Sequence, residues 1–297
     1  MSDIGKNLER DVRELISIIK EALSSLQKGG ERVGDKPKPV QKNVSLIIFN
    51  PTVPSENGRK LSEVMKWGDP DELTEKYIAD VQEASYGCVT YNVVERIETD
   101  TFPAKVDGFV YDADEYVKCV RQGSGFHDPD KVDYKRILEQ FEIVEKVNQG
   151  KIDEAWLFAF PYAGFYESIM GGPGAFWCNA PPLVGAVASP APTRRFVIMG
   201  FNYERGVGEM LEDLGHRAES ILSKVFEGSR GDKNLWERFT RYDKTHPGRA
   251  ECGNVHFAPN SLSDYDWGSR RKVVSRCDDW LNFPNFQDVE RKVDCRD

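Results

Sequence analysis

Residues 209–219 carry four side chains that could do acid–base or metal chemistry on one helix. Glu209, Glu212, His216 and Glu219 recur three or four residues apart, and at about 100° per residue they share one arc of roughly 80°. Apolar residues between positions 207 and 225 occupy the opposite side, so the pattern predicts an amphipathic helix. Carboxylates favour the cationic form of a nearby histidine, and such a histidine can act as an acid–base group or as a metal ligand.

The segment EDLGH, residues 212–216, resembles the H-E-L-G-H form of the zinc-binding helix of the zincin metalloproteases. Glu212 and His216 stand at the two histidine positions of that motif, and Asp213 stands at the position of its catalytic glutamate. The resemblance is confined to these five residues, and the loss of one histidine ligand weakens zinc binding. Three interpretations stay open: a metal site, a metal-free acid–base site, and a purely structural helix face.

A metal site on this helix would draw on the histidines that follow it. We expect Glu212, His216 and Glu219, at i, i+4 and i+7, to hold a divalent ion with a further ligand from His246 or His256. Zinc, manganese and calcium are the candidate ions. Both later histidines fall in the turn-rich segment 245–267, which we expect to form a polar loop facing the helix.

A second candidate region is the segment 161–181, which combines four glycines with two aromatic clusters and few charges. Aromatic faces beside a carboxylate and an amide suit a sugar or a peptide, whereas a loop that completes the core is the alternative. Its GGPG sequence lacks the lysine of a phosphate-binding loop, so no nucleotide cofactor is expected. The expected substrate-binding residues, which include two from neighbouring segments, are Tyr162, Tyr166, Glu167, Trp177, Asn179, Asn202 and Asn254.

The elements that must position these residues alternate between strands and helices. The alternation predicts an α/β fold, with a mixed or mostly parallel sheet layered with helices. Ligands of such sheets bind at the carboxyl ends of the strands, where segments 161–181 and 202–209 begin. The predicted strands are 44–51, 88–98, 152–162 and 194–204, and the predicted helices are 71–86, 133–149 and the helix that carries 209–219.

The chain is predicted to have four parts. Residues 1–28 form an amphipathic helix whose apolar positions between 8 and 26 follow a heptad pattern, so this helix could form a coiled coil that joins copies of the chain. Residues 29–43 form a linker rich in Gly, Pro and Lys. Residues 44–230 form the α/β domain, and residues 231–297 form a loop-rich C-terminal lobe packed on it.

Composition narrows the class of partner. The chain has 297 residues, 39% of them apolar, and a net charge of −9. That charge argues against nucleic acid as a partner, because phosphate binding needs a basic surface. No apolar run approaches the ~20 residues that span a membrane. The first residues have no signal-peptide pattern, so we expect a cytoplasmic protein, or a secreted one if a leader precedes this sequence. The six cysteines include no C-x-x-C pair.

Together these features predict a hydrolase that acts on a glycan or a peptide. The expected cleft lies between the strand ends and the C-terminal lobe. In it Glu204 or Glu212 activates a water, directly or through a metal, and His216 or His256 handles the proton of the leaving group. Two alternatives remain: a non-catalytic carbohydrate-binding protein, and an assembly protein built around the heptad helix.

Overall fold

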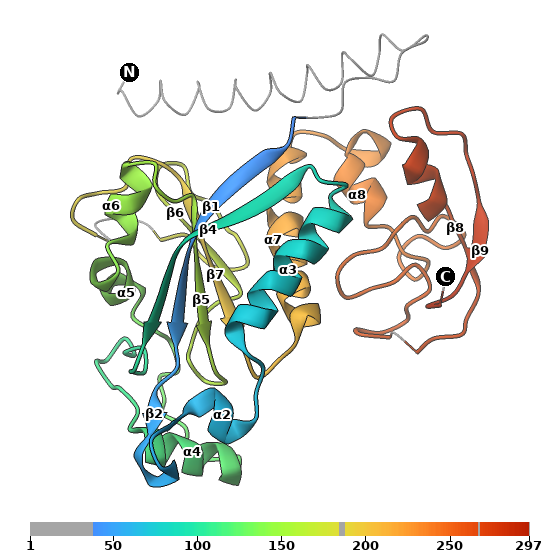
Figure 1. Cartoon of the computed structure of the whole chain (residues 1–297). Helices are drawn as coiled ribbons and strands as arrows, with labels where there is room; N and C mark the ends of the chain where they lie inside the picture. Colours follow the sequence, from blue (N-terminus) through green and yellow to red (C-terminus); the bar gives the residue numbers. More distant parts are fainter. Residues whose placement is uncertain (1–37, 184–187, 267, 297) are drawn as a thin grey trace. The chain divides into compact units, whose positions relative to one another are not determined.

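A computed structural model describes residues 38–183, 188–266 and 268–296 (Figure 1). The predicted heptad helix, residues 8–26, lies outside these ranges. The chain divides into two compact units between Leu214 and Gly215, inside helix α7 (Val207–Val225). The predicted boundary at residue 230 followed the end of that helix. The division comes earlier because the first turns of α7 pack on the core of the sheet through Met210, Leu211 and Leu214.

The first unit is built on a five-stranded sheet with the strand order β4-β1-β5-β7-β6. The first four strands in that order are parallel, and only the edge strand β6 is antiparallel. The predicted α/β fold with a mixed, mostly parallel sheet is therefore confirmed. The strands are β1 (Val40–Phe49), β4 (Val89–Thr99), β5 (Glu154–Ala159), β6 (Ser168–Gly171) and β7 (Phe196–Asn202).

Helices cover both faces of this sheet, which explains why β1, β5 and β7 are nearly continuous apolar runs. Helix α3 (Pro70–Ala84) lies on one face, and α5 (Tyr134–Gln140) and α6 (Ile143–Asn148) lie on the other (Figure 1). On the α3 face, Tyr77 is fully buried and packs edge-on against Trp156 and Phe201, with ring centroids 5.1 and 5.2 Å apart.

Three predicted elements differ from the structure. The predicted helix 133–149 is two helices, α5 and α6, because Glu142 takes a left-handed conformation with φ of 51° that a right-handed helix cannot accommodate. The segment 161–181, predicted to be a loop throughout, contains strand β6. Strand β1 also begins at Val40, inside the predicted linker, where it pairs with Val89.

Short elements follow the carboxyl ends of β1 and β4. Asn50, directly after β1, is buried and exchanges hydrogen bonds with Ser62, whose backbone N–H and hydroxyl oxygen lie 3.1 Å from its side-chain amide. This amide therefore closes the turn after β1. The short elements are β2 (Thr52–Val53), the 3₁₀ turn Pro54–Glu56, β3 (Arg59–Lys60), α2 (Leu61–Met65) and α4 (Ala113–Gln122).

The second unit is rich in loops and relies on polar contacts. Among its described residues, the buried apolar cluster consists of Ala250, Val273 and Val293. The carboxylate of Glu251, 2% exposed, accepts hydrogen bonds from Arg238 at 3.0 Å and from the indole of Trp280 at 2.9 Å. Besides the end of α7, its elements are the 3₁₀ turn Gly231–Lys233, α8 (Leu235–Phe239), β8 (Val273–Ser275), the 3₁₀ helix Cys277–Asn282 and β9 (Arg291–Val293).

In the part of the chain that the structure describes, no helix combines the length and the apolar character needed to cross a bilayer. None of the six cysteines, all of which the structure describes, takes part in a disulfide bond.

Candidate active site

A pocket of about 280 Å³ opens where β5 and β7 end and α7 begins; we call it the strand-end pocket. This is the position at which ligands bind in open α/β sheets. A second hollow, of about 630 Å³, has a single carboxyl group, that of Glu139, among its described lining residues. The strand-end pocket is lined by Asp130, Phe160, Pro161, Tyr162, Ala163, Gly164, Phe165, Glu167, Gly200, Phe201, Asn202, Arg205, Glu209, Met210 and Asp213.

A buried lysine ties together two segments of the pocket wall. The side chain of Lys105 is 1% exposed, and its ammonium group donates to the carboxylate of Asp130 at 2.6 Å. It also donates to the backbone carbonyl of Asp130 at 2.7 Å and to that of Tyr162 at 2.6 Å. A buried ammonium needs such oxygen partners. Lys105 therefore sets the position of the wall relative to the loop that carries Asp130.

Gly164 brings these two segments into backbone contact. Its φ is 84°, and a Cβ atom at this position would lie 1.8 Å from the carbonyl oxygen of Asp130. Its own carbonyl accepts a hydrogen bond from Val132 N–H at 3.2 Å. Only glycine combines this backbone conformation with this approach, so the shape of the wall depends on it.

Two carboxyl groups of the pocket have different surroundings. Burial raises the pKa of Asp213 to about 8; the negative charges of Glu167 and Glu212 add to this effect, and Arg205 opposes it. Glu167 instead accepts a hydrogen bond from the side-chain amide of Asn179. The pocket thus offers one carboxyl group in a protonated state and one held as an acceptor.

The structure brings together some of the expected substrate-binding residues. The strand-end pocket is lined by Tyr162, Glu167 and Asn202. Asn179 is not among the described lining residues, but its side-chain amide donates a hydrogen bond to Glu167. Tyr166 instead stacks on Tyr134 at the edge of the core, and the ring planes are 4° apart.

Three other expected residues lie elsewhere. Trp177 is 59% exposed. Asn254, in the second unit, accepts backbone hydrogen bonds from His256 and Phe257 and so shapes a turn. Glu204 is not among the described residues that line the pocket; its carboxylate lies 3.7 Å from the guanidinium group of Arg205.

Sequence reasoning missed several residues that line the pocket or hold its wall in place. Lys105 stands between Ala104 and Val106, Asp130 stands in a polar stretch, and no spacing marks the two as partners. Arg205 and Asp213 lie in segments that were predicted to matter, directly after β7 and on α7. The fold had to be known before these side chains could be assigned to the pocket.

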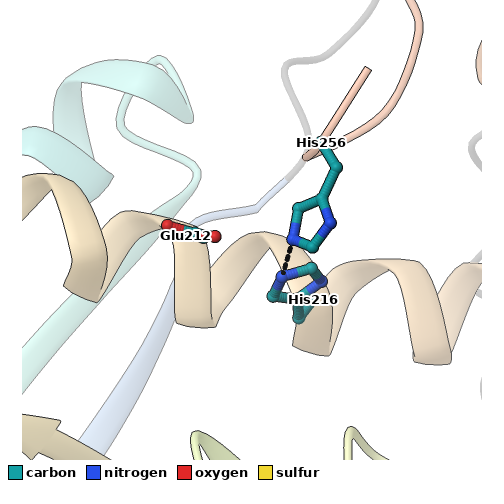
Figure 2. Close-up of side chains that lie close together, drawn as sticks. All are labelled: Glu212, His216 and His256. Carbon is teal, nitrogen blue, oxygen red and sulfur yellow. Dashed lines mark hydrogen bonds between the residues drawn. The ribbon is translucent and has the colours of Figure 1, made fainter. Parts of the chain in front are cut away.

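In the second unit, His216 and His256 form a close pair. Their Nε2 atoms lie 2.9 Å apart (Figure 2). The Nδ1 atom of His216 lies 2.9 Å from a carboxylate oxygen of Glu219, and the Nδ1 atom of His256 lies 3.1 Å from one of Asp264. The phenol oxygen of Tyr265 lies 2.9 Å from Nε2 of His256.

The metal ligands expected from the sequence are only partly grouped here. Glu212, one turn before His216 on α7, places a carboxylate oxygen within 4.8 Å of a ring nitrogen of His216. Glu219 contacts Nδ1, the nitrogen that faces away from His256. The ring of His246 is exposed and contacts the hydroxyl of Thr245 at 3.0 Å, so His256 is the histidine that reaches His216.

No protein-family model matches the sequence, and comparison with curated proteins and with solved structures gives no match.

Proposed function

We propose that the protein is a hydrolase that acts on a glycan, with the strand-end pocket as its active site. The observation that carries this proposal is that Glu167 and Asp213 line one pocket together with the rings of Tyr162 and Phe165. Hydrolysis of a glycosidic bond uses two carboxyl groups, and aromatic rings bind the apolar faces of sugars.

The two carboxyl groups suit different roles. Asp213, whose pKa is raised to about 8 by burial, would donate a proton to the glycosidic oxygen that leaves. Glu167, held by the Asn179 amide, would take a proton from the water that attacks the anomeric carbon. The proton given by Asp213 leaves on the new hydroxyl group, and the proton taken by Glu167 restores the pair after exchange with solvent. Glu167 and Asp213 take the place of the acid–base groups expected from the sequence, because none of Glu204, Glu212, His216 and His256 is among the described residues that line this pocket.

The remaining lining residues suit a small polyhydroxylated ligand. The amide of Asn202 and the guanidinium group of Arg205 can hydrogen-bond hydroxyl groups, and the volume of about 280 Å³ is at the lower end of small-molecule sites. A pocket of this size accepts one end of a glycan. A peptide remains the alternative substrate, and it would be recognised by failure on glycans and turnover of peptides in the same screen.

The test is a screen for released reducing ends on a panel of glycans, with the wild type, Glu167→Gln and Asp213→Asn. Each substitution keeps the size of the side chain and removes its acid–base function, so turnover should fall by about 10²–10⁴. Glu139→Gln, in the second hollow, is the matched control and should keep full turnover. Turnover that survives both pocket substitutions would place the active site elsewhere.

Carbohydrate binding without catalysis is the second candidate function. The side chains of Tyr162 and Trp177 are 47% and 59% exposed, as expected of rings that stack on sugars. A glycan array would separate the two functions. A hydrolase binds a glycan and turns it over, and Glu167→Gln keeps the binding. A binding protein shows no turnover in any variant and loses affinity on Trp177→Ala.

A further inference from the structure

The His216–His256 pair has the geometry of a metal centre without needing any group of the strand-end pocket. The two rings come from α7 and from a loop 40 residues later in the chain, and both are partly buried. Figure 2 shows that the two rings approach each other through their nitrogen atoms.

The carboxylates behind the two rings determine which nitrogen carries the proton. An imidazole whose Nδ1 faces a carboxylate keeps its proton on Nδ1. Glu219 has this relation to His216, and Asp264 has it to His256. The hydrogen bond between the two Nε2 atoms needs a proton between them. A cation bound there would take the place of that proton, and each ring would then keep its proton on Nδ1, beside its carboxylate. Carboxylate–histidine pairs of this kind orient the histidine ligands of protein-bound metals.

The separation of the rings fits a zinc-sized ion after a small adjustment. Tetrahedral zinc with Zn–N bonds of about 2.0–2.1 Å holds two nitrogen ligands about 3.3 Å apart. The Nε2 atoms are 2.9 Å apart, so the rings must separate by only about 0.4 Å. Glu212, one turn before His216 on the same helix, has a carboxylate oxygen within 4.8 Å of the ligand nitrogens of both histidines and is the candidate third ligand. Two nitrogens and one carboxylate leave a fourth position for water, and they favour zinc over calcium, which prefers oxygen ligands.

Two further features hold the loop against α7. Glu219 uses its second carboxylate oxygen to accept the backbone N–H of Val255 at 3.2 Å, so one carboxyl group binds both sides of the site. Gly215 lies beneath Val255, and a Cβ atom at residue 215 would be 2.7 Å from a methyl carbon of Val255. The absence of a side chain at Gly215 therefore lets the loop come close enough for His256 to reach His216.

We infer that His216 and His256, with Glu212, bind a divalent transition-metal ion of the zinc class, and that Glu219 and Asp264 orient the two histidines. This inference is independent of the proposed hydrolase activity, because no residue of the strand-end pocket takes part in it.

The experiment measures zinc binding to the full chain after treatment with a chelator, by competition with a chromogenic zinc indicator. The wild type should bind one zinc ion per chain. His216→Ala and His256→Ala should each weaken binding at least 100-fold, whereas His246→Ala, which removes an exposed histidine of the same unit, should bind as the wild type does. Cobalt(II), added in place of zinc, should give the strong visible absorption bands of a four-coordinate ion.

Asp264→Asn tests the site with a variant that should still fold. The Asp264 side chain is 58% exposed, so its replacement does not disturb a core. It should weaken zinc binding about 10–100-fold through the orientation of His256, with an unchanged far-UV circular dichroism spectrum. Zinc binding by a His216→Ala/His256→Ala double variant with wild-type affinity would overturn the inference, and so would the absence of zinc binding by the wild type. Neither result depends on glycan turnover, so the two proposals fail separately.

Discussion

Replacing Gly164 with alanine should damage the first unit far more than an ordinary glycine substitution does. The new Cβ would lie 1.8 Å from the carbonyl oxygen of Asp130, whereas real Cβ contacts stay above 3.0 Å, so the backbone must move by about 1.2 Å. The left-handed conformation costs alanine about 1–2 kcal/mol. The movement also loosens the Val132–Gly164 hydrogen bond and the Lys105 contact with Asp130, which adds about 1 and 2 kcal/mol. The total loss of unfolding free energy is about 4–5 kcal/mol.

Gly58→Ala is the matched control for this prediction. Gly58 also has a positive φ, of 69°, but nothing lies within 4 Å of the position that a Cβ atom would take there. It should lose only the conformational term of about 1–2 kcal/mol. Urea-induced unfolding followed by circular dichroism measures both variants, and the difference between them isolates the contact with Asp130. A Gly164→Ala variant no less stable than Gly58→Ala would refute the reasoning.

Two further predictions concern the second unit. Hydrogen bonds from the Arg271 side chain and from Gly248 N–H lower the pKa of Asp243 below its usual value. The ionised carboxylate therefore stabilises the folded state above pH ~4. This stabilisation is lost as the pH falls through the lowered pKa. Asp243→Asn should accordingly flatten the acid side of a plot of unfolding free energy against pH, and an unchanged slope between pH 5 and pH 2 would contradict this assignment. Arg238→Ala leaves the carboxylate of Glu251, 2% exposed, without its guanidinium partner, and should lower the free energy of unfolding by about 3–5 kcal/mol. Urea-induced unfolding measures this loss. The control is Arg249→Ala, because the side chain of Arg249 is 62% exposed.

The α/β fold could be predicted from the sequence because its signals are local. The apolar runs in β1, β5 and β7 and the glycines that end the neighbouring helices are contained within about ten residues. The break between α5 and α6 could not be predicted, because the left-handed conformation of Glu142 leaves no pattern in a helical stretch. Strand β6 could not be predicted for a similar reason. It is four residues long, too short to show a pattern of its own, and it forms a strand because it pairs with β7 in the folded sheet.

The residues of the candidate sites could likewise be predicted only where the signal is local. The sequence placed Glu212 and His216 on one face of a helix, and it marked Tyr162, Glu167 and Asn202 as residues that follow strands. Both results depend only on helical geometry and on the position of strand ends.

Which distant residues join these groups was decided by the tertiary structure alone. From the sequence, His246 and His256 were equivalent partners for His216, and only the fold of the 252–266 loop against Gly215 selects His256. Likewise, Lys105 meets Asp130 and Tyr162, 25 and 57 residues away, through contacts that no local pattern encodes. Local spacing in the sequence determines which side chains lie on the same face of one helix or at the end of one strand. Contacts between residues that are tens of positions apart depend instead on how the whole unit packs. Those long-range contacts bring the side chains of separate elements together into the candidate sites.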